Sequence, residues 1–165
     1  MSWPKDGKYL DFLLQKGIQH IVCFAPECRP PVGNPPRNEF IFLEIPVEEF
    51  SAPTLNQVRQ FIEFCEKHQG YSLLGLMEPH DDKPVQRTPP PIALHCRQGL
   101  GRTGAFAACY LVRFFGLTPE MAILQVRKVR PYSIETYSQE RIVFHYYNFL
   151  CTNPPENDDC WKPAE

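Results

Sequence analysis

The sequence has no long hydrophobic run and no excess of one charge. Its longest apolar stretch, residues 105–112, has eight residues, far short of the ~20 that a membrane-spanning helix needs. Lysine and arginine number 17, and aspartate and glutamate number 19, so the formal net charge of -2 gives no general attraction to nucleic acid or anionic lipid. The first residues also lack the apolar segment of a secretory signal. We therefore expect a cytoplasmic or nuclear protein with neither a nucleic-acid nor a membrane partner.

The seven cysteines lack any regular spacing. They form neither the paired pattern of a structural zinc site nor a recognisable disulfide framework. In a cytoplasmic protein such thiols stay reduced, and most of them pack in the core as small apolar side chains. The histidines are scattered, so we expect no metal site and at most one or two chemically active cysteines.

The length and the hydrophobic pattern predict one α/β domain. A chain of 165 residues usually forms a single domain. Apolar runs typical of buried strands occur at residues 18–24, 40–45 and 92–94. They alternate with segments of helical periodicity at about 9–17, 54–65, 103–115, 118–130 and 137–150. This alternation predicts a mostly parallel central sheet flanked by helices.

The 18 prolines fall mainly outside these elements. They concentrate in a loop at residues 26–36, in a stretch at residues 69–91, and near the end of the chain. We interpret residues 69–91 as a proline-rich insertion in a single catalytic domain that spans residues 1–150. Residues 151–165 are interpreted as a disordered tail.

Residues 95–104, His-Cys-Arg-Gln-Gly-Leu-Gly-Arg-Thr-Gly, stand between the third predicted strand and a helix. A glycine-rich loop that leads into a helix can turn several backbone N–H groups toward one anion, usually phosphate, and Arg102 can add a bidentate contact. Cys96, at the base of such an electropositive loop, is expected to have a lowered pKa and to attack phosphorus. The residues that we expect to bind phosphate are Arg97, Gln98, Gly99, Leu100, Gly101 and Arg102.

Two other interpretations of this loop are weaker. An ordinary buried cysteine at the end of a strand would not account for the glycines and the arginine beside it. Residues 99–104 also match the G-x-G-x-x-G pattern of dinucleotide-binding loops. However, only 61 residues follow Gly104, and the next segment is a helix rather than a strand that ends in an acid. We therefore favour a phosphate-binding catalytic loop.

Two segments resemble the cysteine-dependent phosphatases. Residues 95–104 match the His-Cys-x5-Arg signature of that family. Residues 130–140, Arg-Pro-Tyr-Ser-Ile-Glu-Thr-Tyr-Ser-Gln-Glu, are similar to the small atypical dual-specificity phosphatases. The resemblance runs from about residue 9 to residue 149. It implies the cysteine-phosphatase fold, phosphoprotein substrates, a monomer, no cofactor and no metal.

The resemblance also implies roles for four residues of the loop. Cys96 attacks phosphorus and forms a phosphocysteine intermediate. Arg102 and the loop N–H groups hold the equatorial oxygens and stabilise charge in the transition state. Thr103 donates a hydrogen bond to the sulfur and helps it to leave in the second step. His95 orders the loop and does not titrate in catalysis.

The general acid is harder to assign. The family places an aspartate on the loop after the second strand, and the corresponding loop of this sequence has none. An alignment on residues 45–46 puts Val47 at the acid's position. An alignment on Phe50 and the following helix puts Glu49 there, and we prefer the second alignment. If no glutamate of this loop is the acid, the enzyme is slow with poor leaving groups. The other candidates are Glu48 and, in the insertion, Asp81 and Asp82.

Polar residues near the start of the last predicted helix complete the predicted site. Gln139 matches the family's glutamine that positions water for hydrolysis of the intermediate; alternatively it is only a polar residue at a helix start. Ser133 and Glu135 lie on the same loop, and we expect them to border the pocket.

The sequence as a whole therefore predicts a metal-independent protein phosphatase that hydrolyses phosphotyrosine, and phosphoserine and phosphothreonine, through a phosphocysteine intermediate. One alternative is a weakly active or inactive module that binds phosphorylated sites, which the missing aspartate favours. Another is a phosphatase of RNA 5′ ends or of phosphoinositides. The net charge of -2, and Leu100 rather than a lysine in the loop, disfavour such polyanionic substrates.

Overall fold

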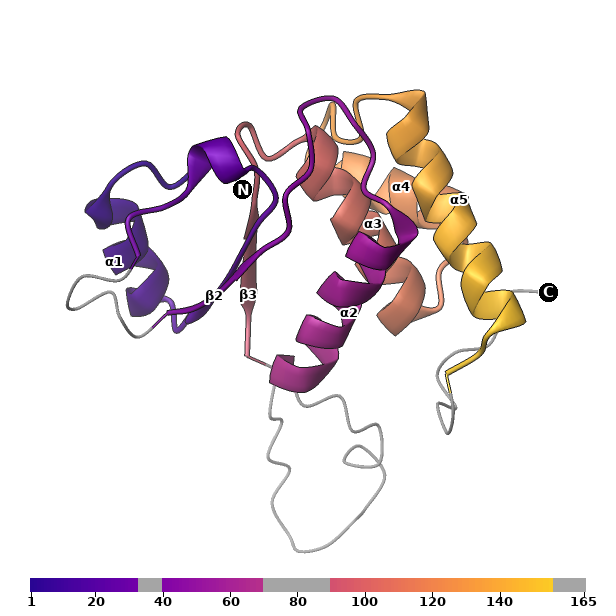
Figure 1. Cartoon of the computed structure of the whole chain (residues 1–165), viewed down its shortest axis with the longest axis horizontal. Coiled ribbons are helices and arrows are strands. Elements are labelled where there is room, and N and C mark those ends of the chain that lie inside the picture. Colours follow the sequence, from indigo (N-terminus) through magenta and orange to yellow (C-terminus); the bar gives the residue numbers. More distant parts are fainter. Residues whose placement is uncertain (33–39, 70–89, 156–165) are drawn as a thin grey trace, which may run out of the picture.

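The computed structural model describes residues 1–32, 40–69 and 90–155 (Figure 1). Most of the predicted insertion, including Asp81 and Asp82, and residues 156–165 of the predicted tail lie outside these ranges. The described elements follow in the order α1 (Gly7–Gln15), β1 (His20–Cys23), the short 3-10 helix η1 (Pro26–Cys28), β2 (Ile41–Glu44), α2 (Leu55–Gln69), β3 (Ile92–His95), α3 (Gly101–Phe115), α4 (Pro119–Val129) and α5 (Tyr137–Thr152).

The sheet is parallel, with β1 between β2 and β3. Cys23, at the carboxyl end of β1, is level with Glu44 of β2 and His95 of β3. All three strands therefore end at the same edge of the sheet, and the loops that follow them meet there. This confirms the predicted parallel sheet and brings the loop after β3 beside the loops after β1 and β2.

Helices cover both faces of the sheet (Figure 1). On one face, Leu10 and Leu13 of α1 pack against Ile21 of β1 and Ala93 of β3. The other face carries the larger core, in which Val22 of β1 joins apolar side chains of α2, α3, α4 and α5. Neighbouring residues of a strand point to opposite faces, so β1 supplies one core with Ile21 and the other with Val22.

Local sequence signals set several helix ends where the sequence predicts them. The Thr118 side chain caps α4, and Pro119 occupies its first turn. Thr136 and Gln139 form a capping box at the start of α5. Gly116 ends α3 in the left-handed conformation, with a φ of 62°.

The start of α3 differs from the prediction. The helix begins at Gly101 rather than at Thr103, because the chain turns helical directly after residues 96–100, which we call the catalytic loop. The backbone N–H of Gly104 already binds the carbonyl oxygen of Leu100 at 2.8 Å. Arg102 is therefore a residue of the first helical turn, which fixes the direction of its side chain.

The end of α5 also differs from the prediction. The helix continues to Thr152, whose hydroxyl donates to the carbonyl oxygens of Asn148 and Phe149 at 3.1 and 3.0 Å. Cys151 is thus a helical residue and not the first residue of a disordered tail. None of the helices in the described ranges is both long and apolar enough to span a bilayer.

Three phenylalanines form the centre of the larger core. The rings of Phe24, which follows β1, and Phe106 of α3 are stacked with centroids 3.9 Å apart. Phe61 of α2 packs edge-on against both rings, at 5.8 Å from Phe24 and 5.4 Å from Phe106. This contact joins the sheet, α2 and α3 at one point, and α3 carries Arg102.

We expect Phe106→Ala to lower the free energy of unfolding by about 3–5 kcal/mol, because it removes a fully buried ring and leaves a cavity. Urea denaturation followed by circular dichroism measures the loss. Phe115→Ala is the matched control, since this ring lies on the same helix and is 61% exposed. Equal losses in both variants would contradict the central role of Phe106.

Candidate active site

A small cavity lies at the edge of the sheet where the strands end. Phe50 is the lining residue that the sequence does not predict; the other six residues that line the cavity are all predicted site residues, namely Glu49, Cys96, Arg97, Gln98, Arg102 and Glu135. The structure therefore brings together side chains from the loops after β2 and β3, from the first turn of α3 and from the loop before α5.

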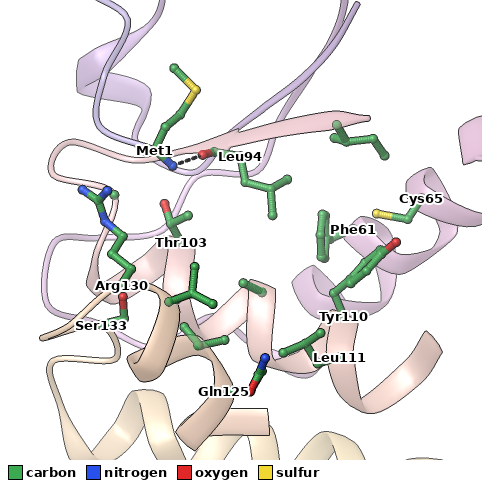
Figure 2. A pocket seen from close by; sticks show the side chains of 16 residues that line it. Met1, Phe61, Cys65, Leu94, Thr103, Tyr110, Leu111, Gln125, Arg130 and Ser133 are labelled. Atoms are coloured by element: carbon green, nitrogen blue, oxygen red, sulfur yellow. Dashed lines mark hydrogen bonds between the residues drawn. The ribbon is translucent and has the colours of Figure 1, made fainter. Parts of the chain in front are cut away.

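A second cavity, of about 460 Å³, lies behind the catalytic loop (Figure 2). Thr103 and Arg130 border one end of it, and Phe61 and Tyr110 border the other. Most of its lining is apolar, and neither the thiol nor the guanidinium of the predicted site reaches it. We therefore place the candidate active site in the smaller cavity, where both groups lie.

The catalytic loop turns at Gly99 so that its backbone faces the sulfur of Cys96. Gly99 has a φ of 74°, and its N–H donates to Cys96 Sγ at 3.2 Å. A Cβ at this position would overlap the backbone of Met1 and Ser2. Both the left-handed conformation and the lack of space therefore require glycine here.

The surroundings of Cys96 favour the thiolate. The residue is 3% exposed, and burial alone would raise the pKa of its thiol. The hydroxyl and the N–H of Thr103, the N–H of Gly99 and the charge of Arg102 outweigh burial and lower the pKa below its usual value. Thr103 Oγ1 is itself buried and has no hydrogen bond of regular geometry to a described residue, so we attribute its effect to proximity to the sulfur.

Cys96 differs in this respect from the other described cysteines. Burial raises the pKa of Cys23 to about 11, and it also raises the pKa values of Cys28, Cys65 and Cys109. Cysteine thus behaves mainly as a core residue in this fold, and Cys96 is the one whose thiol pKa shifts downward in the described ranges. Among these residues, no group of three or more His, Cys, Asp or Glu side chains is arranged to hold a metal ion.

Arg102 is buried, with 3% of the residue exposed. Two groups that are distant along the sequence bind its guanidinium. One terminal nitrogen donates to the carbonyl oxygen of Val47 at 2.8 Å, and the other donates to Glu27 Oε1 at 2.9 Å. Burial would raise the pKa of Glu27, but its backbone N–H and the charges of Arg102 and Arg97 lower it overall. The guanidinium is therefore pre-oriented, and its remaining N–H groups are available for phosphate oxygens.

His95 is fully buried beneath the loop. Its Nδ1 lies 3.3 Å from the carbonyl oxygen of Cys96, while its Nε2 has no partner among the described residues. Burial, with the positive amino terminus, lowers the pKa of His95 to about 4 against the opposing effect of the Cys96 carbonyl. The imidazole is therefore neutral near pH 7, as a group that orders the loop would be.

Of the two predicted glutamates, Glu49 is the one that lines the small cavity. Its Oε2 lies 3.4 Å from a terminal nitrogen of Arg97, and 38% of its side chain is exposed. Glu48 is exposed and does not line the cavity. Directly after Glu49, Phe50 adopts a left-handed conformation with a φ of 61°, which is unusual for a bulky residue and turns the loop at this point.

Gln139 is fully buried and joins two of the site's loops. Its Oε1 accepts from the N–H of Glu135 at 2.8 Å, and its Nε2 donates to the carbonyl oxygen of Ser51 at 3.1 Å. A Cβ at Gly101 would meet both amide atoms at 2.9 Å and would overlap the carboxylate of Glu135. Gln139 thus serves the helix cap and also lies against the start of α3.

Sequence reasoning missed Glu27, the carbonyl of Val47, Arg127 of α4 and Arg130, which follows α4. Arg130 donates to the carbonyl oxygen of Gln98 at 2.9 Å, and Arg127 binds the loop before α5. The two arginines stand one helical turn apart at the end of α4, and this spacing is the one signal that would have pointed to a shared role. Glu27 has no local signal, because it meets Arg102 across 75 residues.

The chain is similar in sequence to known phosphatases. Residues 1–143 match a family model described as PTP-SAK, the Swiss Army Knife protein DSP-PTPase phosphatase domain. Protein tyrosine phosphatase domain-containing protein 1 from Bos taurus is 48% identical over 59 residues, which cover 36% of this chain and 7% of that protein. Dual specificity protein phosphatase CDC14A from Homo sapiens is 34% identical over 84 residues, which cover 51% of this chain and 11% of that protein. The chain thus spans only a small part of these relatives.

Solved structures share the fold. PTPMT1 in complex with PI(5)P has a TM-score of 0.71 at 17% identity, over 93% of this chain and 92% of that chain. Tk-PTP in the active form has a TM-score of 0.67 at 20% identity, over 87% of each chain. At these identities the likeness establishes the cysteine-phosphatase fold. Because the family model covers most of the sequence, the chain belongs to the PTP-SAK family of DSP-PTPase phosphatase domains.

Proposed function

We propose that this chain is a metal-independent phosphatase that hydrolyses phosphate monoesters on proteins. The observation that supports this most is the Cys96 thiol, whose pKa is lowered in the same small cavity that holds the guanidinium of Arg102. The thiolate is the nucleophilic form of cysteine, and the guanidinium provides paired donors for phosphate oxygens. A module that only binds phosphorylated sites would use the arginine but has no need of a thiolate.

In the first step, the sulfur of Cys96 attacks phosphorus in line with the bond to the leaving oxygen. The S–P bond forms as the P–O bond breaks, and the product is a phosphocysteine. Arg102 and the N–H groups of the loop stabilise the charge on the three equatorial oxygens. Glu49 donates a proton to the leaving oxygen, so that the group departs as a neutral alcohol or phenol.

In the second step, a water molecule attacks phosphorus and the S–P bond breaks. Glu49, now a carboxylate, accepts a proton from this water, and the sulfur leaves as a thiolate that Thr103, Gly99 and Arg102 stabilise. Gln139, whose amide lies against Gly101 at the start of α3, is our candidate for the group that orients the water.

We expect phosphotyrosine, and also phosphoserine and phosphothreonine, as substrates. The cavity is small and opens beside Phe50, which is 61% exposed. An aromatic side chain at the rim can pack against the ring of a phosphotyrosine. A small cavity of this kind also suits a side chain as short as phosphoserine.

A phosphoinositide is the second candidate substrate, because PTPMT1, solved in complex with PI(5)P, has the same fold. The charges around the cavity make it less favourable. Arg102 and Arg97 are already paired with Glu27 and Glu49, and Glu135 adds a further carboxylate. Additional phosphates of a headgroup or of an RNA 5′ end would meet these acids at close range.

Three finer expectations from the sequence stay predictions. One is a particular likeness to dual specificity protein phosphatase 23, which residues 95–104 and 130–140 suggest. The others are a monomeric state and a cytoplasmic or nuclear location.

The account of the thiolate predicts that Thr103→Val raises the pKa of Cys96, because the hydroxyl lowers it and valine keeps the shape of the side chain. The pH dependence of Cys96 alkylation by iodoacetamide gives this pKa. The background carries Cys151→Ser and Cys160→Ser, so that neither of these thiols contributes to the alkylation signal. The midpoint should move to higher pH, and an unchanged midpoint would argue against the part of Thr103.

Hydrolysis of para-nitrophenyl phosphate should continue in excess EDTA and disappear in Cys96→Ser. The reason is that the nucleophile is a cysteine side chain and the charge is stabilised by Arg102 and backbone groups. Steady-state rates with and without the chelator are sufficient. Activity that requires a divalent metal, or that survives in Cys96→Ser, would overturn the proposed chemistry.

Glu49→Gln should abolish the fall of kcat at high pH, whereas Glu48→Gln should keep it, because only Glu49 lines the cavity. The loss in Glu49→Gln should be larger for an alkyl phosphate than for an aryl phosphate, since an alkoxide needs the proton more. The pH–rate profiles of both variants measure this. Loss of the basic limb in Glu48→Gln instead would reassign the acid.

A further inference from the structure

Arg127 lies in the last turn of α4, outside the small cavity, and binds the loop between α4 and α5. Its Nε donates to the carbonyl oxygen of Ser133 at 3.1 Å, and its Nη2 donates to that of Ile134 at 2.9 Å. The same Nη2 also contacts Glu140 Oε1 at 2.7 Å, at the first turn of α5. One side chain therefore ties the loop to the helices on both sides of it.

This loop has a backbone that needs such support. Tyr132 has a φ of 67° and Ile134 a φ of 61°, so two non-glycine residues are left-handed within three positions. Such conformations are unfavourable for side chains with a Cβ, and a β-branched isoleucine is the more unfavourable case. They persist where the surrounding contacts hold them. The guanidinium of Arg127 donates a hydrogen bond to the carbonyl oxygen of Ile134, one of the two left-handed residues.

The supported loop in turn contacts the catalytic loop from behind. The N–H of Ile134 points at the carbonyl oxygen of Leu100 at 3.4 Å, and Arg130, at the start of the loop, donates to the carbonyl oxygen of Gln98 at 2.9 Å. A Cβ at Gly104, in the first turn of α3 that follows the catalytic loop, would approach Ile134 to 3.0 Å and Ser133 to 3.1 Å, so the α4–α5 loop packs tightly against this turn. Figure 2 shows Arg130 and Ser133 near Thr103 of α3.

The same loop also reaches the segment that carries Glu49. Gln139 accepts from the N–H of Glu135 and donates to the carbonyl oxygen of Ser51 at 3.1 Å. The hydroxyl of Thr136 adds a contact of 3.4 Å to the carbonyl oxygen of Phe50. The loop that carries Cys96 and the loop that carries Glu49 therefore both form hydrogen bonds with the α4–α5 loop or the start of α5, the segment that Arg127 binds.

We propose that Arg127 is a positioning residue, which fixes the α4–α5 loop and through it the geometry of the catalytic loop. It touches no reacting atom in this account. The expected loss of activity rests on the proposed function. The effect on the catalytic loop does not, because it can be measured without turnover.

The test compares Arg127→Met with Lys128→Met, which removes the same charge from the next, exposed position of α4. With Cys151→Ser and Cys160→Ser in the background, Cys96 alkylation is followed against pH at a temperature where circular dichroism shows every variant folded. We expect the midpoint of Arg127→Met to rise by on the order of one pH unit, because the backbone donors to the sulfur lose their alignment. Lys128→Met should match the parent protein.

Hydrolysis of para-nitrophenyl phosphate supplies the second readout. A displacement of about 1 Å in a catalytic group can cost on the order of 100-fold in rate, so we expect kcat of Arg127→Met to fall by about 10- to 100-fold. The KM should change less, because the loop donors act mainly on the charge that develops in the transition state.

Two further variants separate positioning from a simple ion pair. Arg127→Lys keeps the charge opposite Glu140 but has a single donor nitrogen in place of the separate Nε and Nη2 donors, so it cannot reproduce this fork and should behave like Arg127→Met. Glu140→Gln removes the ion pair and leaves both carbonyl contacts, so it should behave like the parent. The reverse pattern, with full rescue by lysine and a large effect of Glu140→Gln, would overturn the proposal.

An alkylation midpoint that is the same in Arg127→Met and Lys128→Met would also overturn it. These outcomes are distinct from a failure of the proposed function. If the parent protein shows a lowered alkylation midpoint but hydrolyses no phosphate ester, the phosphatase assignment fails while the alkylation series still decides the role of Arg127.

Discussion

The close packing of backbone around the Cys96 sulfur is the constraint on which the rest of the site depends. Gly99 is left-handed and points its N–H at the sulfur, and there is no room for a Cβ at Gly99, or at Gly101 without displacing Glu135 and Gln139. The loop is thus confined between the amino-terminal residues and the α4–α5 loop. An anion nest needs this confinement, because donors that are free to turn would lose their alignment with the charge they stabilise.

Burial and charge oppose each other at this point, and their balance decides the chemistry. Desolvation acts against every thiolate in the core, as it does at Cys65 and Cys109. At Cys96 the nearby hydroxyl, the two N–H groups and the guanidinium reverse the outcome. Arg102 contributes without being free to move, since Glu27 and Val47 hold it from the loops after β1 and β2. The parallel register of the strands is what brings these loops within reach.

The sequence was sufficient to predict the parts of the site that are contiguous along the chain. The three strands and the turn after β3 follow from local patterns, because apolar runs specify the strands and glycines specify the turn. The order of the strands in the sheet was not predicted. The helix starts of α4 and α5 follow from their caps in the same way. Other helix ends were wrong by two to four residues. The first helix lies two residues earlier than predicted, and α2 continues to Gln69. The chain turns helical directly after the catalytic loop at α3, and side-chain hydrogen bonds extend α5.

The contacts between distant segments were beyond sequence reasoning. Glu27 looks like any exposed acid until the fold brings it to Arg102, and Arg127 looks like a solvated helix residue until Ser133 and Ile134 turn their carbonyls toward it. Neither contact produces a pattern in the neighbouring sequence, because its partners come together only when the core has formed. Glu49 is intermediate, since its loop was identified from the sequence but its place at the cavity came from the left-handed turn at Phe50.

The central claim is that the phosphoryl group is transferred to the sulfur of Cys96 before water releases it. Rapid quenching of the full chain during turnover of an aryl phosphate, followed by peptide mass spectrometry in acid, tests it directly. The account predicts the mass of one added phosphoryl group on the peptide that contains Cys96. Hydrolysis that proceeds while this peptide stays unmodified, or with the phosphoryl group on another residue, would contradict it.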